Sequence, residues 1–260
     1  MADAIIKAVQ ATKNFGGLVA VDHLDLTLTQ GSIHSLIGPN GSGKTTFLNL
    51  LSRIYDLSEG QILFKTTAVN RLAPHRVAEL GVARTFQNIR LFGDLSILDN
   101  VMVGCHCRGK SALRDILFRT RRLRDEEREF RRRALEMLEF VGLDVPSDRV
   151  ATQLSYGQQR LVEIARALAS SPSVLLLDEP AAGMNPVEKA ELVNLIRKIR
   201  DKLGITVLLV EHNMNVVMTI SEKVTVINFG RKIAEGTPQE VQESEEVIEA
   251  YLGRRLEEDA

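Results

Sequence analysis

The sequence has no tryptophan, only two cysteines among its 260 residues, and few aromatic side chains of any kind. Two cysteines cannot build a disulfide framework, and Cys105 and Cys107, on either side of His106, lack further ligands at a matching spacing. Free thiols are therefore favoured over a metal site. No apolar run approaches the about 18 residues of a membrane-spanning helix. The first residues carry no secretory signal, so we expect a cytoplasmic protein unless a partner holds it at a membrane.

The net charge is also close to zero, because the sequence has 33 Lys and Arg and 34 Asp and Glu. This balance gives no case for a nucleic-acid partner, and none is expected. The charge is nevertheless uneven: residues 108–133 contain eleven Lys and Arg against five acids, whereas residues 240–260 contain eight acids and two Arg. The basic stretch predicts either a solvated helix face with Arg–Glu pairs or a contact with anionic lipid or a membrane-protein loop.

The composition, 44% hydrophobic and 26% charged, is that of an ordinary globular chain. Strand and helix patterns alternate at both ends of the chain, which predicts an α/β fold. Strands are expected over residues 5–9, 19–21, 24–29, 33–37, 174–177, 205–210 and 224–228, and helices over 45–51, 160–169, 187–202 and from 216 to 220. We predict one domain, residues 1–260, with an α/β core of 1–87 and 170–260 and a helical insert of 88–169.

A glycine-rich loop links the strand of residues 33–37 to the helix that follows it. It reads Gly38-Pro39-Asn40-Gly41-Ser42-Gly43-Lys44-Thr45 and matches the phosphate-binding pattern G-x-x-x-x-G-K-[ST]. Its glycines let backbone N–H groups form an anion nest, and the helix N-terminus adds partial positive charge. We expect Lys44 to reach the β- and γ-phosphates and the Thr45 hydroxyl to bind Mg²⁺, with Thr46 also in the nucleotide site.

The apolar stretch of residues 174–177 ends in two acids, Asp178 and Glu179. A buried strand here brings both to the carboxyl edge of the sheet, where doubly wound folds bind ligands. We expect Asp178 to hold Mg²⁺, directly or through water, and Glu179 to act as general base toward an attacking water. The alternative, two acids that only cap a turn, is disfavoured beside a phosphate loop.

Two further polar residues are candidates, one where the core gives way to the helical insert and one after a strand. Gln87, in Arg84-Thr85-Phe86-Gln87, can bind Mg²⁺ or water and sense the γ-phosphate, or can be an exposed loop residue. His212 follows the strand of residues 205–210 and can bind the γ-phosphate and hold the attacking water. A lone histidine after a strand is more often structural, so its role needs other support.

A second anion-binding surface is predicted at Leu154-Ser155-Tyr156-Gly157-Gln158, which precedes a helix. Ser155, Gly157 and the helix N-terminus can contact phosphate. The two phosphate-contacting elements need not serve the same nucleotide. They suit a sandwich in which each ATP lies between one subunit's phosphate loop and the serine–glycine turn of the other.

This set of motifs, in this order, resembles the ATP-binding subunit of an ABC transporter over essentially the whole chain. In that resemblance residues 38–45 are the P-loop, Gln87 the Q-loop, 154–158 the signature, 182–185 the D-loop and His212 the switch histidine. Phe15 matches the aromatic residue that stacks on adenine, although it can also be a core residue beside Gly16. Gln158 belongs with Ser155 and Gly157 to the implied nucleotide contacts.

The resemblance implies a RecA-like P-loop NTPase core with an N-terminal antiparallel β subdomain and an inserted α-helical subdomain. It implies ATP hydrolysis with Mg²⁺, catalysed through Lys44, Gln87, Glu179 and His212. The implied partners are a second ATP-binding subunit (identical or similar), integral membrane permease subunits and, indirectly, an extracytoplasmic solute-binding protein. The implied location is the cytoplasmic face of the inner membrane.

Finer features resemble the ATPases of branched-chain amino acid importers, and among the paired ATPases the longer one. They are residues 15–21, 84–87, 90–92, 154–158, 179–186 and Tyr251-Leu252-Gly253. Relatives that import urea, amides or other amino acids leave the solute open. A soluble ABC ATPase in assembly or nucleic-acid work is disfavoured because the chain has one half only, and a non-catalytic protein because Lys44 and Glu179 are present.

Three positions depart from the family pattern. Tyr156 stands where most ABC proteins have glycine, although tyrosine is usual in this subgroup and we expect activity to survive. Arg53 stands where relatives commonly have glycine, which bears on local packing and not on ATP binding. Asn185 stands where many relatives have aspartate.

Overall fold

The computed structural model describes residues 3–118 and 120–252, so Arg119 of the basic stretch and residues 253–260 of the acidic tail lie outside the described residues. Within that part, strands form a six-stranded sheet in the order β10-β9-β3-β8-β7-β6 and a four-stranded sheet in the order β2-β1-β4-β5. The strands are β1 Ala4–Phe15, β2 Leu18–Thr29, β3 Ile33–Ile37, β4 Glu59–Phe64, β5 Thr67–Ala68, β6 Val82–Arg84, β7 Val174–Asp178, β8 Thr206–Val210, β9 Lys223–Asn228 and β10 Arg231–Gly236.

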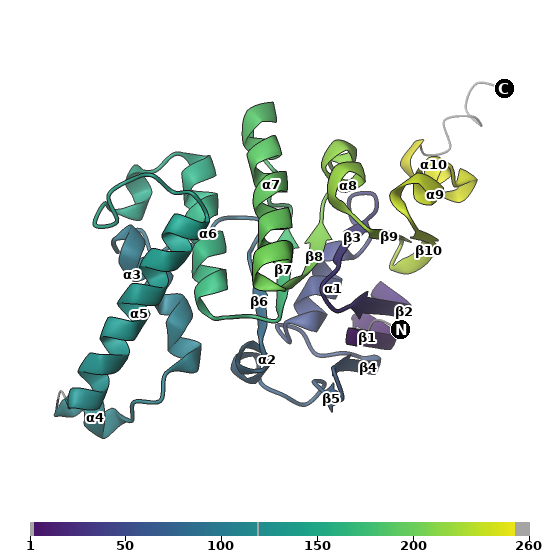
Figure 1. The fold of residues 1–260 in the computed structure, drawn as a ribbon. Coiled ribbons are helices and arrows are strands. Elements are labelled where there is room, and N and C mark those ends of the chain that lie inside the picture. Colours follow the sequence, from purple (N-terminus) through teal and green to yellow (C-terminus); the bar gives the residue numbers. More distant parts are fainter. Residues whose placement is uncertain (1–2, 119, 253–260) are drawn as a thin grey trace.

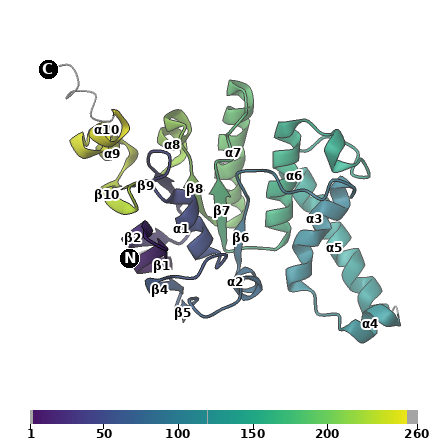
Figure 2. The ribbon, with the colours of Figure 1, turned by 180° about the vertical axis from the view of Figure 1, so that it is seen from behind.

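Helices α3 to α6 gather at one end of the molecule, and β1, β2, α9 and α10 lie toward the other (Figures 1 and 2). Short 3-10 helices cover His106–Arg108 and Ala151–Gln153. The α-helices are α1 Lys44–Leu51, α2 Pro74–Leu80, α3 Ile97–Cys105, α4 Leu113–Leu117, α5 Arg121–Phe140, α6 Tyr156–Ala169, α7 Pro186–Leu203, α8 Met214–Ile220, α9 Pro238–Gln242 and α10 Glu245–Leu252.

The central sheet is parallel except for β10, which is antiparallel to β9. Every residue of β3, β7 and β8 is buried, as expected for strands covered on both faces. Val174 and Leu176 of β7 belong to a core with α1 and the antiparallel sheet. Leu175 and Leu177 belong to a core with α3, α5, α6 and α7. The helical end of the molecule therefore shares one continuous hydrophobic core with the sheet.

The predicted α/β class with an antiparallel β subdomain and a helical subdomain is confirmed. The division into residues 1–87 and 170–260 against 88–169 stays a prediction. The first strands differ in detail, because β1 continues to Phe15 and β2 runs unbroken where the pattern indicated two pieces. Register shifts interrupt their pairing, and Gln10 and His23 have positive φ of 48° and 47°. Such bulges let a strand continue while its side-chain alternation breaks.

Both cysteines are free thiols, and no cluster of three His, Cys, Asp or Glu able to hold a metal is found among the described residues. Burial raises the pKa of the Cys105 thiol to about 11, so it is protonated at neutral pH. In the described ranges, no helix is both long and apolar enough to cross a bilayer.

A buried histidine in β3 makes stability depend on pH. His34 is 1% exposed, and its Nε2 lies 2.8 Å from Thr225 Oγ1 of β9. Burial lowers the pKa of His34 to about 4, so the unfolded chain takes up a proton first as pH falls. The stability this residue provides is complete above about pH 6.5 and is lost toward pH 4.

We expect the unfolding free energy of the protein to fall by about 2 kcal/mol more than that of His34→Gln between pH 7 and pH 5. Urea unfolding at both pH values measures this difference. His75→Gln, at an exposed position, is the control and should keep the full drop of the parent. Equal pH dependence of the parent and His34→Gln would contradict the assignment.

Candidate functional site

A cleft of about 990 Å³ opens at the carboxyl edge of the parallel strands. Of the residues predicted from sequence, it gathers the whole glycine-rich loop with Thr46, together with Phe15, Gln87, Glu179 and His212. Asp178 lies below this surface, at 1% exposure. Ser155, Gly157 and Gln158 do not line the cleft. One chain thus brings together all but one part of the predicted site.

The glycine-rich loop follows directly from β3 and ends at Lys44, the first residue of α1. A Cβ at Gly38 would lie 2.0 Å from the Ile227 carbonyl oxygen, and one at Gly43 would lie 2.3 Å from that of Ala20. Gly43 also has a φ of 102° and is the N-cap of α1. Only glycine permits this close approach, which leaves the first N–H groups of α1 facing the cleft without a capping side chain.

Lys44 is mostly buried at the base of the cleft. Its Nζ donates hydrogen bonds to the carbonyl oxygens of Gly38 at 2.7 Å and Pro39 at 2.8 Å. Burial lowers the pKa of Lys44, and the negative charges of Glu179 and Asp178 oppose that shift. The ammonium group is thus held by carbonyl oxygens of the loop, where it can balance the charge of a bound anion.

Asp178 ends β7 and pairs with Arg84, which sequence analysis did not single out. The Arg84 Nη2 donates to Asp178 Oδ2 at 2.8 Å, and its Nη1 donates to Asn49 Oδ1 of α1 at 2.6 Å. Both charged side chains are buried, at 6% and 1% exposure. Asp178 Oδ1 is buried without a hydrogen-bond partner among the described residues. This unsatisfied carboxylate oxygen is suited to a cation or a water bound to one.

Three predicted residues meet at one carboxylate oxygen. The Gln87 Nε2 donates to Glu179 Oε2 at 3.0 Å, and His212 Nδ1 lies 3.5 Å from the same oxygen. Glu179 has a φ of 46°, an unfavourable conformation for a residue with a side chain, and its N–H donates to the Val210 carbonyl at 2.9 Å. The tertiary structure therefore holds this carboxylate in a strained, defined position that faces the cleft.

The loop that carries Gln87 is anchored by a buried ion pair on α6. Arg160 and Glu163 are 0% and 1% exposed, with Arg160 Nη1 2.6 Å from Glu163 Oε2. Arg160 donates to the carbonyl oxygens of Phe86 at 2.6 Å and Gln87 at 2.8 Å, while Glu163 accepts from the N–H of Phe86 at 3.2 Å. A displacement of α6 would therefore also displace the loop that carries Gln87, because these hydrogen bonds connect the two.

Glu211 is a second residue that the sequence did not reveal. Its side chain is fully buried, and Oε1 accepts from the N–H of Ala181 at 2.8 Å. Oε2 accepts from the N–H of His212 at 3.1 Å and of Asn213 at 3.3 Å. One carboxylate thus ties the loop after Glu179 to the loop that carries His212. An acid placed directly after a buried strand was the signal available.

The serine–glycine turn lies on the surface at the start of α6. Ser155 is the N-cap: its Oγ accepts from the Gln158 N–H at 3.3 Å, and Gln158 Oε1 accepts from the Ser155 N–H at 3.1 Å. Tyr156 is accommodated, because its hydroxyl oxygen accepts from Arg160 Nη2 at 3.2 Å. The turn is thus rigid and exposed, and a second molecule would be needed to place it on a nucleotide in this cleft.

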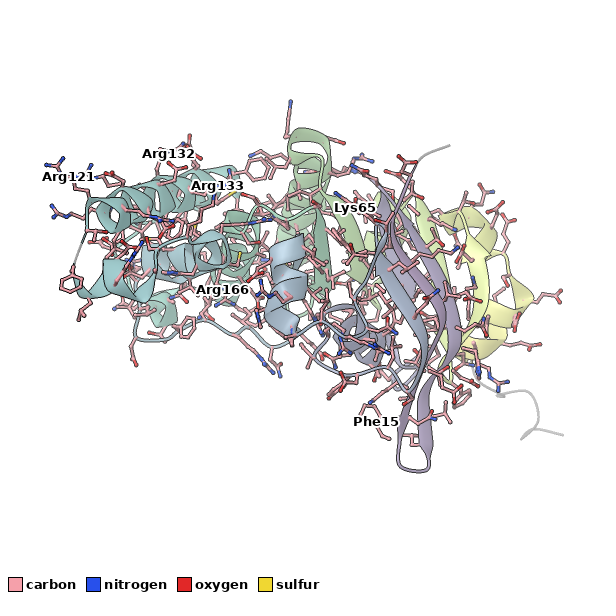
Figure 3. All side chains as sticks on the ribbon, turned by 90° about the horizontal axis from the view of Figure 1, so that it is seen from below. Phe15, Lys65, Arg121, Arg132, Arg133 and Arg166 are labelled. Atoms are coloured by element: carbon pink, nitrogen blue, oxygen red, sulfur yellow. The ribbon has the colours of Figure 1, made fainter. Side chains whose placement is uncertain are left out.

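Phe15 stands at the mouth of the cleft with 42% of its surface exposed. Its ring packs edge-on against Tyr55 with centroids 5.2 Å apart, and Lys13 Nζ lies 5.0 Å from its centroid. Figure 3 shows it near the β1–β2 turn, at the edge of the molecule. The ring is therefore available to a flat ligand and is not part of the core.

The cleft is also lined by residues that the sequence did not indicate. They are Leu18, Val19, Ala20, Phe229, Gly230 and Tyr251. Tyr251 comes from α10, where burial raises the pKa of its hydroxyl and a hydrogen bond with the Gly38 backbone opposes that shift. The one available signal was its place in the C-terminal motif.

Arg53, one of the departures, has a φ of 59° in the region that favours glycine. Its guanidinium compensates by donating to the Leu72 carbonyl at 3.1 Å and pairing with Asp56 at 2.6 Å. Asn185 caps α7, where its Oδ1 accepts from the N–H groups of Val187 and Glu188. At both positions the polar side chain therefore has hydrogen-bond partners in its own surroundings.

Comparison with known proteins gives consistent matches. The family model described as "ABC transporter" matches residues 21–182, and that described as "Branched-chain amino acid ATP-binding cassette transporter" matches residues 231–257. The high-affinity branched-chain amino acid transport ATP-binding protein BraF of Pseudomonas aeruginosa is 42% identical over 253 residues, covering 97% of this chain and 99% of its own.

Two solved structures extend the comparison. An ATP-binding cassette of an ABC transporter in its ADP conformation superposes with a TM-score of 0.84 at 33% identity, covering 96% of this chain and 99% of its own. A dimeric ATP-binding cassette in a post-hydrolysis state, bound to ADP and Pi, superposes with a TM-score of 0.77 at 27% identity, covering 90% and 98%.

Glu211→Ala would leave three backbone donors without their acceptor. We expect it to lower the unfolding free energy by about 3 kcal/mol, since unsatisfied buried donors are costly. Urea unfolding measures this, and hydrogen exchange should show lost protection at Ala181, His212 and Asn213. Glu191→Ala, exposed on α7, is the control. Unchanged protection at those amides would contradict the bridging role of Glu211.

Proposed function

This chain belongs to the ABC transporter family, and on that premise we propose that it binds and hydrolyses ATP to power an importer of branched-chain amino acids. The observation that carries the proposal is the single cleft that gathers the glycine-rich loop, Gln87, Glu179 and His212. A nucleoside triphosphate has the charge and shape that this cleft would take. The adenine would lie on Phe15 and the phosphates in the loop.

Hydrolysis is assigned to the residues around Glu179. Its carboxylate would take a proton from the water that attacks the γ-phosphorus, while Gln87 and His212 orient carboxylate and water. Their contacts to one oxygen at 3.0 and 3.5 Å support this role. Lys44 would offset negative charge on the phosphates as it builds up in the transition state.

Mg²⁺ is the cation that this donor set would hold. Thr45 and Gln87 line the cleft, and the unsatisfied Oδ1 of Asp178 lies beneath it. Hydroxyl, amide and carboxylate oxygens are the ligands Mg²⁺ prefers, together with several waters. When bound, the ion would supply Lewis-acid polarisation of the phosphate oxygens.

A second ATP-binding subunit, identical or similar, would complete the site. Ser155, Gly157 and Gln158 are held rigidly but away from the cleft of their own chain. The dimer found for a solved cassette bound to ADP and Pi supports a two-subunit assembly. In such an assembly this turn would cover the nucleotide of the partner. Closure would move α6, and through Arg160 the Gln87 loop, against permease subunits at the cytoplasmic face of the membrane.

The identity of the transported solute is inferred from the relatives, because the cleft binds nucleotide and not solute. The match of residues 231–257 and the name of the Pseudomonas relative support branched-chain amino acids as the solute. An extracytoplasmic binding protein would deliver it. An importer of urea, amides or other amino acids is the alternative. ATPase assays of the reconstituted complex with each solute class would separate them, since only the true solute should stimulate hydrolysis.

Glu179→Gln should lower kcat for ATP hydrolysis by about 10²- to 10⁴-fold and leave ATP binding nearly unchanged. The amide keeps an acceptor for Gln87 but cannot take a proton, so an ATP-loaded dimer should accumulate. Phosphate release and size-exclusion chromatography measure both effects. Glu191→Gln is the control. Normal hydrolysis by Glu179→Gln would show that the general-base role is wrong.

Lys44→Ala should weaken ATP binding by at least about tenfold, because a charge-assisted hydrogen bond to phosphate is lost. Calorimetric titration measures the affinity directly. Lys65→Ala, exposed and remote from the cleft, should bind like the parent. Unchanged affinity of Lys44→Ala would rule out the phosphate role of the loop.

A further inference from the structure

The segment that contains α4 and the start of α5, residues 110–118 and 120–122, is called the α4–α5 turn here and is held in place by one carboxylate of its own and one from farther along α5. Asp115 is 6% exposed and accepts from the Ala112 N–H at 2.9 Å and the Thr120 hydroxyl at 3.1 Å. Glu126 of α5 accepts from the N–H groups of Lys110 at 2.6 Å and Ser111 at 3.2 Å. The α4–α5 turn is therefore a built element and not a loose loop.

This element presents two large apolar side chains to solvent. Leu117 and Phe118 are each 75% exposed. The backbone holds them there, since the Phe118 N–H donates to the Arg114 carbonyl at 3.0 Å. An ordered turn that exposes two adjacent large hydrophobic residues marks a contact surface, because their burial is otherwise a source of stability.

The charge around these residues is positive. Residues 110–122 contain five Lys and Arg and one Asp, and that Asp is Asp115, turned inward. Among the described residues, the ion pairs of α4 and α5 involve Arg128, Arg132 and Arg133 and not Arg114 or Arg121, although the charge of Arg114 helps to lower the pKa of Asp115. Figure 3 shows Arg121 at the far end of the helical arm, directed away from the molecule.

The rest of α5 behaves differently. Arg128 pairs with Asp125 at 3.3 Å, and Arg132 pairs with Glu129 and Glu136 one turn away on either side. This is the Arg–Glu ladder of a solvated helix, one of the two alternatives for the basic stretch. The ladder offsets positive charge in the middle of the helix, whereas Arg114 and Arg121, beside Leu117 and Phe118, take no part in it.

We propose that the α4–α5 turn rests on the anionic surface of the membrane, with Leu117 and Phe118 in the headgroup region and Arg114 and Arg121 on lipid phosphates. Apolar side chains bordered by arginines are the arrangement that interfacial segments use, and each cation near an anionic surface adds to binding. The inference rests on the proposed function in that the chain works beside a membrane. It adds a lipid contact that is independent of the permease.

The test uses the full chain alone, without permease or nucleotide. Flotation with vesicles of phosphatidylcholine and phosphatidylglycerol in equal amounts, at low ionic strength, should carry the protein with the lipid, whereas pure phosphatidylcholine should not. The double variants Leu117→Ser/Phe118→Ser and Arg114→Glu/Arg121→Glu should each weaken binding by about tenfold or more. Lys65→Glu, on another face, is the matched charge control, and Leu135→Ser, exposed on α5, is the apolar control.

Several outcomes would overturn the proposal. They are failure of the parent to float, equal flotation with neutral vesicles, or equal losses in the control variants. Loss of permease co-purification in the turn variants with unchanged flotation would assign the turn to a protein contact instead. ATP hydrolysis in solution should stay at the parent level in all variants, so a failed vesicle assay with intact hydrolysis leaves the proposed function standing.

Discussion

The contact of Gln87 with the carboxylate of Glu179 links the start of the helical arm to the central sheet inside the cleft. Gln87 leads into the helical arm, while Glu179 ends a strand of the central sheet, and the two side chains meet at 3.0 Å. Behind Gln87 stands the buried Arg160–Glu163 pair, and beside Glu179 stands Glu211 with its three backbone donors. The geometry of the cleft depends on these buried charges because each holds a loop that has no regular structure of its own.

The site departs from the local rules that the rest of the chain follows. Glu179 has a positive φ, Asp178 has an unsatisfied buried oxygen, and Lys44 is a buried cation among carbonyl groups. Each feature costs stability in isolation. The fully buried strands β3, β7 and β8 provide the packing that offsets these costs. Strain concentrated at one edge of a well-packed sheet is the usual mark of a functional site.

Part of this site was predictable because its residues lie in short, continuous sequence patterns. The glycine-rich loop and the acids after residues 174–177 are short patterns whose chemistry is contained in a few neighbouring residues. Gln87 and His212 carry no such pattern and were indicated by their place in the order of motifs. Arg84 and Glu211 escaped detection because their roles lie in contacts across the fold: Arg84 meets Asp178, 94 residues later, and Glu211 meets Ala181, 30 residues earlier. The length of β1 and β2 was underestimated because bulges break the alternation on which strand prediction depends.

Because the chain has no tryptophan, its intrinsic fluorescence depends on where its three tyrosines lie. Tyr55 packs on Phe15 at the mouth of the cleft, Tyr251 lines the cleft, and Tyr156 stands in the exposed turn before α6. The tyrosine emission of this protein, excited at wavelengths where phenylalanine does not absorb, therefore originates entirely at its functional surfaces. Intrinsic fluorescence, which in most proteins averages over the whole fold, is here an unlabelled spectroscopic probe of nucleotide entry and subunit closure.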